Sequence, residues 1–281
     1  VLPAGLDLAT DDVAQPRAGY GVLREISAGK DSTTGHWELM GVVTETPFPT
    51  YPQGFPLEVL TAFRETTGYD LLGNVAASGT EIIQRLGDEH VRTGKPIVYT
   101  SADSVFQIAA HEDVIPPPEL YRQCAVAYEM LVSGRGLGRI IARPFVGKPG
   151  AFRRTANRRD FAIPPPTATL LDLVRQAGLP VVAIGKIEDL FAGHGMTRAV
   201  HTASDDESVD EIEAALGATD RGLIMANLVD FDAQYGHRNN VEGYGMNLER
   251  FDARLSGLLP LLSRDDMLVL TADHGNDPTT V

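Results

Sequence analysis

Five short apolar runs, each followed by a polar or glycine-rich turn, constrain the fold most strongly. They are Pro96–Thr100, Arg139–Ala142, Pro180–Gly185, Gly222–Val229 and Met267–Ala272. Runs of this length between turn signals are typical of buried strands. Because helical patterns lie between some of them, the sequence predicts an α/β chain with a mostly parallel sheet.

Two segments carry the clearest helical patterns. Asn247–Leu262 has apolar residues spaced by three and four, which predicts one apolar stripe. Pro260 lies inside this stripe, so we expect the helix to kink or end near it. Ser208–Leu216 is a shorter, acidic candidate. A further helix is expected over Glu119–Leu131, with Cys124 in the core.

Proline is concentrated in two places. Thr46–Pro56 contains four prolines, and Pro164–Pro166 is a run of three. Such segments are locally stiff and extended, which suits a crossing between domains. The two segments together predict an inserted domain. Two proline-rich surface loops within a single domain explain the same composition equally well.

Charge and cysteine content exclude several classes of protein. The 281 residues include 24 Lys and Arg against 38 Asp and Glu, a formal net charge of −14. A general nucleic-acid binder needs a basic face, so we expect no nucleic-acid partner. No apolar run approaches the roughly 18 to 20 residues of a membrane helix, so no membrane partner is expected. The single Cys124 fits a reducing compartment, and we expect a cytoplasmic protein.

Acidic residues and histidines follow two of the predicted strands. Asp273 and His274 come directly after Met267–Ala272, and Asp232 and His237 follow Gly222–Val229. Ligands bind outside the carboxyl ends of strands in open parallel sheets, so two neighbouring strands would bring these side chains together. Carboxylate and imidazole ligands without thiolates favour Mn²⁺, Mg²⁺, Fe²⁺ or Zn²⁺ in a two-metal site. The alternative is two independent, solvated turns.

A run of hydroxyl residues, Ser32, Thr33 and Thr34, lies between Gly29-Lys30 and His36. Such a run is a candidate for a nucleophile, although Ser/Thr-rich turns are also common. The segment is not a phosphate-binding Walker A loop, because that motif places a glycine where this chain has Arg24.

A set of cations indicates a local anion site in an acidic chain. We expect Arg139 to open a strand and Arg143 to close it. The other cations lie in a Gly/Pro-flanked loop or directly after the strand Pro180–Gly185; they are Arg153, Arg154, Arg158, Arg159 and Lys186. Guanidinium groups bind phosphate with two parallel hydrogen bonds. Surface solubility is the alternative explanation, and we favour it for Arg158 and Arg159.

Long strings of the sequence resemble the phosphopentomutase family of the alkaline-phosphatase superfamily. The resemblance covers nearly the whole chain, in the family's order. The strings are REISAGKDSTTGHWE, NVAASGTEII, TGKPIVYTSADSVFQIAAHE, GRIIARPFVG, FRRTANRRDFA, VAIGKIEDLFAG, NLVDFDAQYGHR and LTADHGNDPT. This many long strings are far more specific than any single short motif.

The resemblance implies a fold and an activity. The fold is an alkaline-phosphatase-like α/β core with a mostly parallel sheet and an inserted smaller α/β cap domain. The implied division is core at 1–46, cap at 47–165 and core at 166–281. The implied activity is the interconversion of α-D-ribose 1-phosphate and D-ribose 5-phosphate, and of the 2-deoxyribose pair, with two divalent metal ions, expected to be Mn²⁺.

The resemblance also implies roles for particular residues. Asp273 and His274 would bind one metal ion, and Asp232 and His237 the other. Ser32 stands where the family has its phosphorylated threonine, and a serine hydroxyl can do the same chemistry. Thr33 and Thr34 are out of register with that position. The residues implied to bind substrate are Ser101, Asp103, Arg139, Arg154 and Lys186.

Two further ligands of the family, an Asp on its first strand and a third His, have no counterpart within residues 1–281. We therefore expect a sequence that lacks both ends of the family's chain. A metal-dependent phosphohydrolase, another mutase of the superfamily, or an inactive fragment that only binds sugar phosphates remain the alternatives. The sequence makes no prediction of the oligomeric state.

Overall fold

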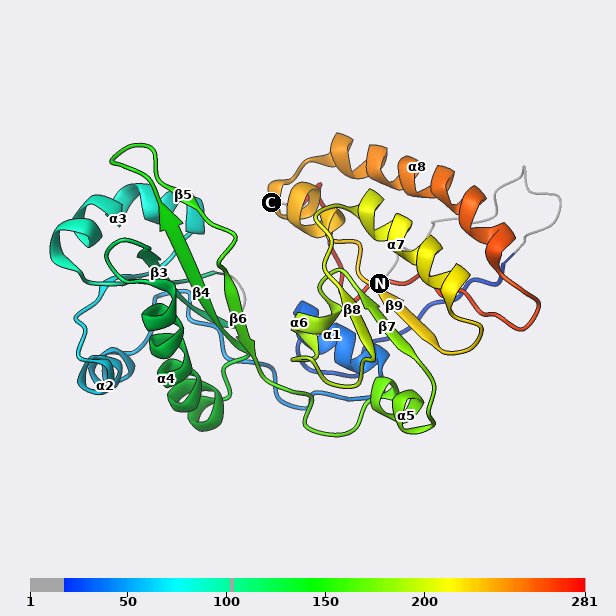
Figure 1. Ribbon diagram of the computed structural model, residues 1–281, viewed down its shortest axis with the longest axis horizontal. Coiled ribbons are helices and arrows are strands. Elements are labelled where there is room, and N and C mark those ends of the chain that lie inside the picture. The colour runs from blue at the N-terminus through cyan, green and yellow to red at the C-terminus, as the bar shows by residue number, and fades with distance from the viewer. Residues whose placement is uncertain (1–17, 102–103, 281) are drawn as a thin grey trace.

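Two sheets organise residues 18–101 and 104–280, the part of the chain that the computed structural model describes (Figure 1). Helices cover both faces of each sheet, so the α/β class is confirmed. In this part of the chain, no helix combines the length and apolar character that a membrane crossing requires.

The larger sheet has six strands and is mixed. Its order is β1-β2-β3-β4-β5, with β6 also paired to β4. The pairs β1–β2 and β3–β4 are parallel, and β2–β3, β4–β5 and β4–β6 are antiparallel. The strands are β1 (Leu72–Ala76), β2 (Ile97–Thr100), β3 (Val105–His111), β4 (Arg139–Val146), β5 (Arg153–Arg154) and β6 (Arg159–Ala162).

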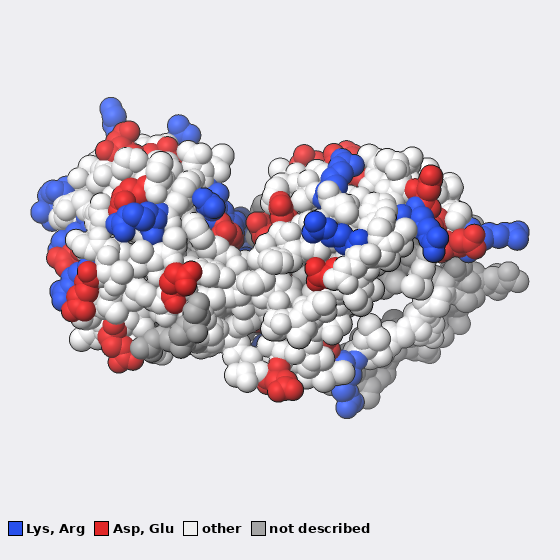
Figure 2. Space-filling view, turned by 60° about the horizontal axis from the view of Figure 1, so that its bottom comes forward, with Lys and Arg blue, Asp and Glu red and all other residues white. Residues whose placement is uncertain are grey.

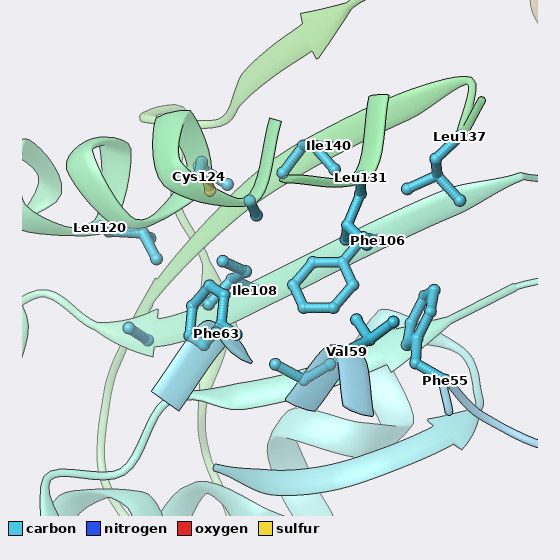
Figure 3. Close-up of a cluster of buried hydrophobic side chains, with 14 of the residues drawn as sticks. Phe55, Val59, Phe63, Phe106, Ile108, Leu120, Cys124, Leu131, Leu137 and Ile140 are labelled. Atoms are coloured by element: carbon cyan, nitrogen blue, oxygen red, sulfur yellow. The ribbon is translucent and has the colours of Figure 1, made fainter. Parts of the chain in front are cut away.

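Helices α2 (Leu57–Thr67) and α4 (Pro117–Arg135) pack on one face of this sheet, and α3 (Gly79–Thr93) packs on the other. Neighbouring residues of a strand point to opposite faces. Phe106 and Ile108 therefore join Phe63 and Cys124 in the core under α2 and α4 (Figure 3). Cys124 is fully buried there, as the sequence predicts.

The smaller sheet is fully parallel, with the order β8-β7-β9. Its strands are β7 (Val181–Ile184), β8 (Arg198–Val200) and β9 (Leu223–Ala226). Val182 and Ile184 face α7 (Asp205–Ala218), while Val181 and Ala183 face the opposite side. That side is covered by α1 (Ser32–Leu39), α5 (Leu170–Gln176) and α6 (Ile187–Leu190), and α8 (Val241–Leu258) packs against α7.

Local sequence patterns predicted several of these elements. Four of the five apolar runs coincide with all or part of β2, β4, β7 and β9. Helix α8 ends at Leu258, and Pro260 lies in the short 3₁₀ turn Leu259–Leu261 that follows, so the proline ends the helix as expected.

The strand predicted over Met267–Ala272 is wrong, because this segment has no regular secondary structure. Met267 is 86% exposed and Val269 is 63% exposed. A strand exists only through hydrogen bonds to a neighbouring strand. Among the described residues the smaller sheet stops at β9, so this apolar segment has no strand to pair with.

Arg143 does not close a strand, which corrects a second expectation. The sequence predicts a strand that closes at Arg143, but β4 continues to Val146. Proline lacks only its own N–H donor, so a strand can continue through it with one bond fewer. Arg143 therefore lies in mid-strand, on the same face of the sheet as Arg139.

The chain passes between the two sheets twice, once between α1 and α2 and once between β6 and α5 (Figure 1). The proline-rich segments Thr46–Pro56 and Pro164–Pro166 occupy these two crossings. The division into core at 1–46, cap at 47–165 and core at 166–281 remains our proposal.

Candidate functional site

The site begins at the first turn of α1, where Asp31 caps the helix. The Asp31 carboxylate accepts a hydrogen bond from the Thr34 N–H at 3.1 Å and another from the Thr34 hydroxyl at 2.8 Å. The cap makes Ser32 the first residue of the helix. Ser32 therefore lies where backbone N–H groups lack intrahelical acceptors and the helix dipole favours an anion.

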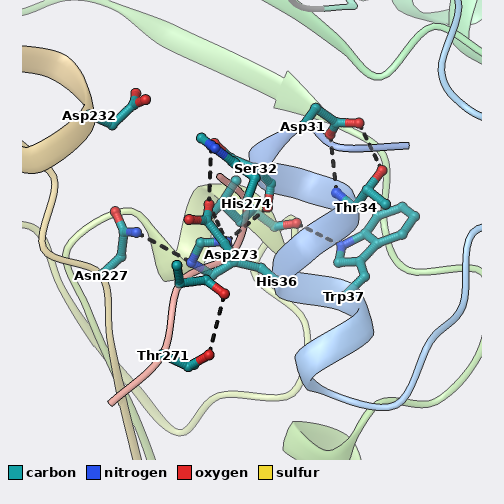
Figure 4. A network of polar contacts seen from close by, with 12 residues as sticks. Asp31, Ser32, Thr34, His36, Trp37, Asn227, Asp232, Thr271, Asp273 and His274 are labelled. Carbon is teal, nitrogen blue, oxygen red and sulfur yellow. Dashed lines mark hydrogen bonds and ion pairs between the residues drawn. The ribbon is translucent and has the colours of Figure 1, made fainter. Parts of the chain in front are cut away.

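The Ser32 hydroxyl contacts an imidazole from the far end of the chain. Ser32 Oγ lies 3.3 Å from His274 Nε2 (Figure 4). Thr34, in contrast, is 1% exposed, and its hydroxyl donates a hydrogen bond to Asp31. Of the hydroxyls in this run, Ser32 is thus directed at a candidate metal ligand and Thr34 is committed to the helix cap.

A second imidazole, His36, holds Asp273 in place. His36 Nδ1 lies 2.8 Å from the Ser32 carbonyl oxygen and 3.2 Å from Asp273 Oδ2. Its Nε2 lies 3.3 Å from Asn227 Nδ2, so a proton on Nδ1 lets Nε2 accept from this amide. Burial alone would raise the pKa of Asp273, but the hydrogen bond and charge of His36 bring that pKa below its usual value.

Gly35 allows this approach, because a Cβ at position 35 would overlap the Asp273 backbone. Sequence reasoning noted His36 but assigned it no partner, and it missed Asn227 altogether. The available signal for Asn227 was its place directly after the apolar part of Gly222–Val229.

The other predicted ligand pair lies after β9, in the turns Phe231–Tyr235 and Gly236–Arg238. His237 Nε2 is 3.3 Å from Asp232 Oδ2, and Asn276 donates a hydrogen bond of 2.9 Å to Asp232 Oδ1. Burial would raise the pKa of Asp232, but the His237 hydrogen bond and nearby positive charges lower it. Asn276, which sequence reasoning did not single out, ties the two candidate ligand segments together.

The four predicted ligands form two carboxylate–imidazole pairs. His274 Nε2 lies 3.7 Å from Asp273 Oδ2, and Asp232 lies to one side of this pair in Figure 4. Across residues 18–101 and 104–280, no three His, Cys, Asp or Glu side chains are grouped closely enough to hold a metal ion. The donor chemistry fits a hard or borderline divalent cation, and each pair offers one oxygen and one nitrogen.

The substrate residues inferred from the sequence occupy several places. Arg139 lies 3.6 Å from Asp160, and Arg154 donates a hydrogen bond to Thr80. Burial lowers the pKa of Lys186, while the charge of Asp232 acts in the opposite direction. Ser101 directly follows β2 and is half-buried. Asp103 lies outside the described residues.

A small cavity of about 20 Å³ is lined by residues that belong to both sheets and their helices. Ser32 lines it together with Arg139, which opens β4 of the larger sheet. The remaining lining residues are Asp31, Thr33, Phe48, Ser104, Val105 and Gly138. The candidate nucleophile and one candidate phosphate-binding arginine therefore share one cavity, although they belong to different layers of the fold.

The surface carries charged side chains of both signs, and no broad basic face is visible in Figure 2. The face shown in Figure 2 carries basic and acidic side chains interspersed over both halves of the molecule, with a broad uncharged neck between them. The concentration of arginines in β4, β5 and β6 is thus local.

Comparison with known proteins gives one consistent result. Residues 23–281 match the model of the Metalloenzyme superfamily. A protein named phosphopentomutase from Caldanaerobacter subterraneus subsp. tengcongensis is 57% identical over 261 residues, which cover 93% of this chain and 66% of the relative. Proteins of the same name from Desulfitobacterium hafniense and Dictyoglomus thermophilum are 57% and 55% identical, covering 96% and 94% of this chain and 70% and 68% of the relatives. The chain thus spans about two thirds of the length of these relatives.

Proposed function

The chain belongs to the phosphopentomutases of the Metalloenzyme superfamily, and from this premise we propose that Ser32 carries the phosphoryl group that the enzyme transfers. The family is an isomerase family that acts on sugar phosphates. The proposed reaction interconverts α-D-ribose 1-phosphate and D-ribose 5-phosphate, and the corresponding 2-deoxyribose phosphates. We propose that it takes place in the cytoplasm, which suits a chain with one buried thiol.

One observation carries this proposal: the Ser32 hydroxyl lies 3.3 Å from His274 Nε2 and lines a cavity with Arg139. A phosphoryl group on Ser32 would lie at the N-terminus of α1, where N–H groups and the helix dipole stabilise negative charge. The cap formed by Asp31 fixes that end of the helix. The nucleophile is therefore held in a site that suits its phosphorylated form.

The reaction passes the phosphoryl group out and back. The bond between Ser32 Oγ and phosphorus breaks as a bond forms from phosphorus to the free hydroxyl oxygen of the pentose phosphate. The proton of that hydroxyl passes, directly or through solvent, to the released Ser32 Oγ, which becomes a hydroxyl again. The sugar then carries two phosphates. After reorientation, its other phosphate returns to Ser32, and the isomeric monophosphate is released. Catalysis depends on position and charge rather than on further covalent steps.

Metal dependence belongs to the superfamily, and we propose two ions, most simply Mn²⁺. Asp273 and His274 would hold one ion, and Asp232 and His237 the other. When bound, the ions supply positive charge that offsets the charge developing on the phosphoryl oxygens. His36 and Asn276 each contact one of the carboxylates, so they would orient Asp273 and Asp232 toward the site.

Arg139, Arg154 and Lys186 are proposed to bind the phosphate that does not react, and Ser101 and Asp103 to contact the sugar. The cavity at Ser32 holds about 20 Å³, which is water-sized, and we propose that the two halves part to admit a pentose phosphate. Closure around the bisphosphate would then exclude water and prevent loss of the intermediate.

The decisive variants are Ser32→Ala and its neighbour Thr33→Val. Both residues line the cavity, so the two variants change the same place, but only Ser32 is proposed to carry the phosphoryl group. We expect Ser32→Ala to abolish isomerisation of ribose 1-phosphate and Thr33→Val to retain it. Isomerisation by Ser32→Ala would disprove the assignment, and release of free phosphate as the main product would show a phosphohydrolase instead.

A further inference from the structure

The hydroxyl of Tyr99 is buried without a partner on the α3 face of the larger sheet. Tyr99 is the third residue of β2 and is 1% exposed, among Ile82, Ile97 and Phe145. Within the described residues, no hydrogen-bond partner lies within reach of its Oη. Leaving a buried hydroxyl unpaired costs about 1–3 kcal/mol, so the position calls for a bound group that satisfies it.

This hydroxyl is directed at the N-terminus of α3. A Cβ built on Gly79, the first residue of α3, would lie 2.5 Å from Tyr99 Oη and 3.6 Å from Arg154 Cζ. The Ser78 side chain makes no cap hydrogen bond to the helix. Because Gly79 has no Cβ, the Tyr99 hydroxyl can lie against the first turn of this 15-residue helix, close to the Arg154 guanidinium.

Positive charge exceeds negative charge around Tyr99. Burial raises the pKa of Tyr99, and the charges of Arg143, Arg154 and Arg158 act against that rise. Arg143 has a pKa lowered to about 10, first because it is buried and then because Arg158 and Arg154 repel it. Asp160, the nearby acid, already pairs with Arg158 at 2.6 Å. Arg143 and Arg154 therefore lie close together without a paired carboxylate among the described residues.

The arginines of β4 connect this place to the cavity at Ser32. Arg139 and Arg143 are four residues apart, so they point to the same face of the sheet and their Cα atoms lie about 13 Å apart. Arg139 lines the cavity with Ser32, and Arg143 donates a hydrogen bond to Gln107 at 3.1 Å. The row of arginines on this face of β4 therefore runs from the cavity at Ser32 toward Tyr99.

We propose that Tyr99, Arg143 and the first turn of α3 join Arg154 in a subsite that binds the phosphate monoester group which does not react. A phosphate dianion accepts several hydrogen bonds at once, and this place offers a hydroxyl, guanidinium groups and helix N–H groups. The proposal rests on the proposed mutase function and adds Tyr99, Arg143 and Gly79 to it. Tyr99 would donate a hydrogen bond from its hydroxyl to a phosphate oxygen.

The test measures binding of D-ribose 5-phosphate to the full chain by calorimetry, with Ser32→Ala as the background so that no turnover occurs. Because a hydrogen bond to a charged group contributes about 1.5–3 kcal/mol, we expect Tyr99→Phe to raise Kd about tenfold or more. Gly79→Ala should weaken binding as well, since its methyl group would crowd the Tyr99 hydroxyl. Tyr128→Phe is the matched control, because it removes a hydroxyl from α4 on the other face of the sheet, and its Kd should not change.

Two further ligands separate a phosphate contact from a structural effect. Inorganic phosphate should show the same loss in Tyr99→Phe, and D-ribose, which has no phosphate, should show none. An unchanged Kd for ribose 5-phosphate overturns the subsite, and so does an equal loss for D-ribose. Either result leaves the turnover test of Ser32→Ala intact, so failure of the subsite and failure of the proposed function are distinguishable.

Discussion

Asn247 should be among the least replaceable residues of the α7–α8 layer. It is 2% exposed, and its Nδ2 donates a hydrogen bond of 2.7 Å to Asp205 Oδ2. Asp205 and Asp230 in turn exchange bonds: the N–H of each donates to the carboxylate of the other, at 3.0 and 2.9 Å. These hydrogen bonds among Asn247, Asp205 and Asp230 fix the start of the turn that carries Asp232.

Asn247→Leu keeps the side-chain volume but removes the donor. The buried Asp205 carboxylate then loses a hydrogen bond to a charged group, a loss of about 1.5–3 kcal/mol in the free energy of unfolding. For about 2 kcal/mol, Tm should fall by about 4–8 °C. Chemical denaturation followed by circular dichroism measures the change, and Glu249→Gln, at an exposed position of α8, is the control.

The same hydrogen bonds determine how the stability difference between wild type and Asn247→Leu depends on pH. Burial raises the pKa of Asp205, and the bonds from Asp230 and Asn247 oppose that rise. Loss of the Asn247 hydrogen bond raises the pKa of Asp205 in the folded state further. A raised folded-state pKa stabilises the folded protein in acid, where Asp205 is protonated. This stabilisation is lost as the pH rises through that pKa. The stability gap between wild type and Asn247→Leu should therefore widen with rising pH. A gap under about 0.5 kcal/mol, or one that narrows, would refute the reasoning.

Three other predictions concern different parts of the molecule. Asp31→Ala removes the cap of α1 and should cost about 1 kcal/mol of stability, and it should slow isomerisation because Ser32 is the next residue; denaturation and a coupled assay measure the two effects. Cys124 is buried and burial raises the pKa of its thiol, so it should react with a thiol reagent only after unfolding; rapid labelling of the folded protein would contradict the packing of α4. Removing divalent metal with a chelator should abolish isomerisation, and adding Mn²⁺ should restore it; full activity in the metal-free protein would contradict the metal assignments.

Local patterns in the sequence predicted several strands and one long helix. The runs that became β2, β4, β7 and β9 and the stripe that became α8 are examples. Met267–Ala272 has the same composition, yet it forms no strand, because strand formation depends on a partner and not on the segment itself. Pairing of this kind is set by residues distant in sequence.

In the candidate site, some residues could be predicted from motifs, and others became evident only from the fold. Ser32, Asp273 and His274 could be nominated from motif positions, and the contact between Ser32 and His274 joins residues 242 apart. His36 and Asn276 act by orienting a carboxylate, and spacing along the sequence gives no signal for such contacts. The sequence around Tyr99 likewise has an ordinary strand pattern, and only the fold shows that the Tyr99 hydroxyl lies beside Gly79.

The most direct test of the central claim is to follow the phosphate of the substrate. D-ribose 5-phosphate carrying labelled phosphorus would be given to the phosphorylated enzyme, and the protein would be quenched and digested. Because the proposed sequence returns the substrate's own phosphate to the enzyme, the account predicts label on the peptide that contains Ser32, and on Ser32 itself. Isomerisation without label on the protein, or label on another residue, would contradict it.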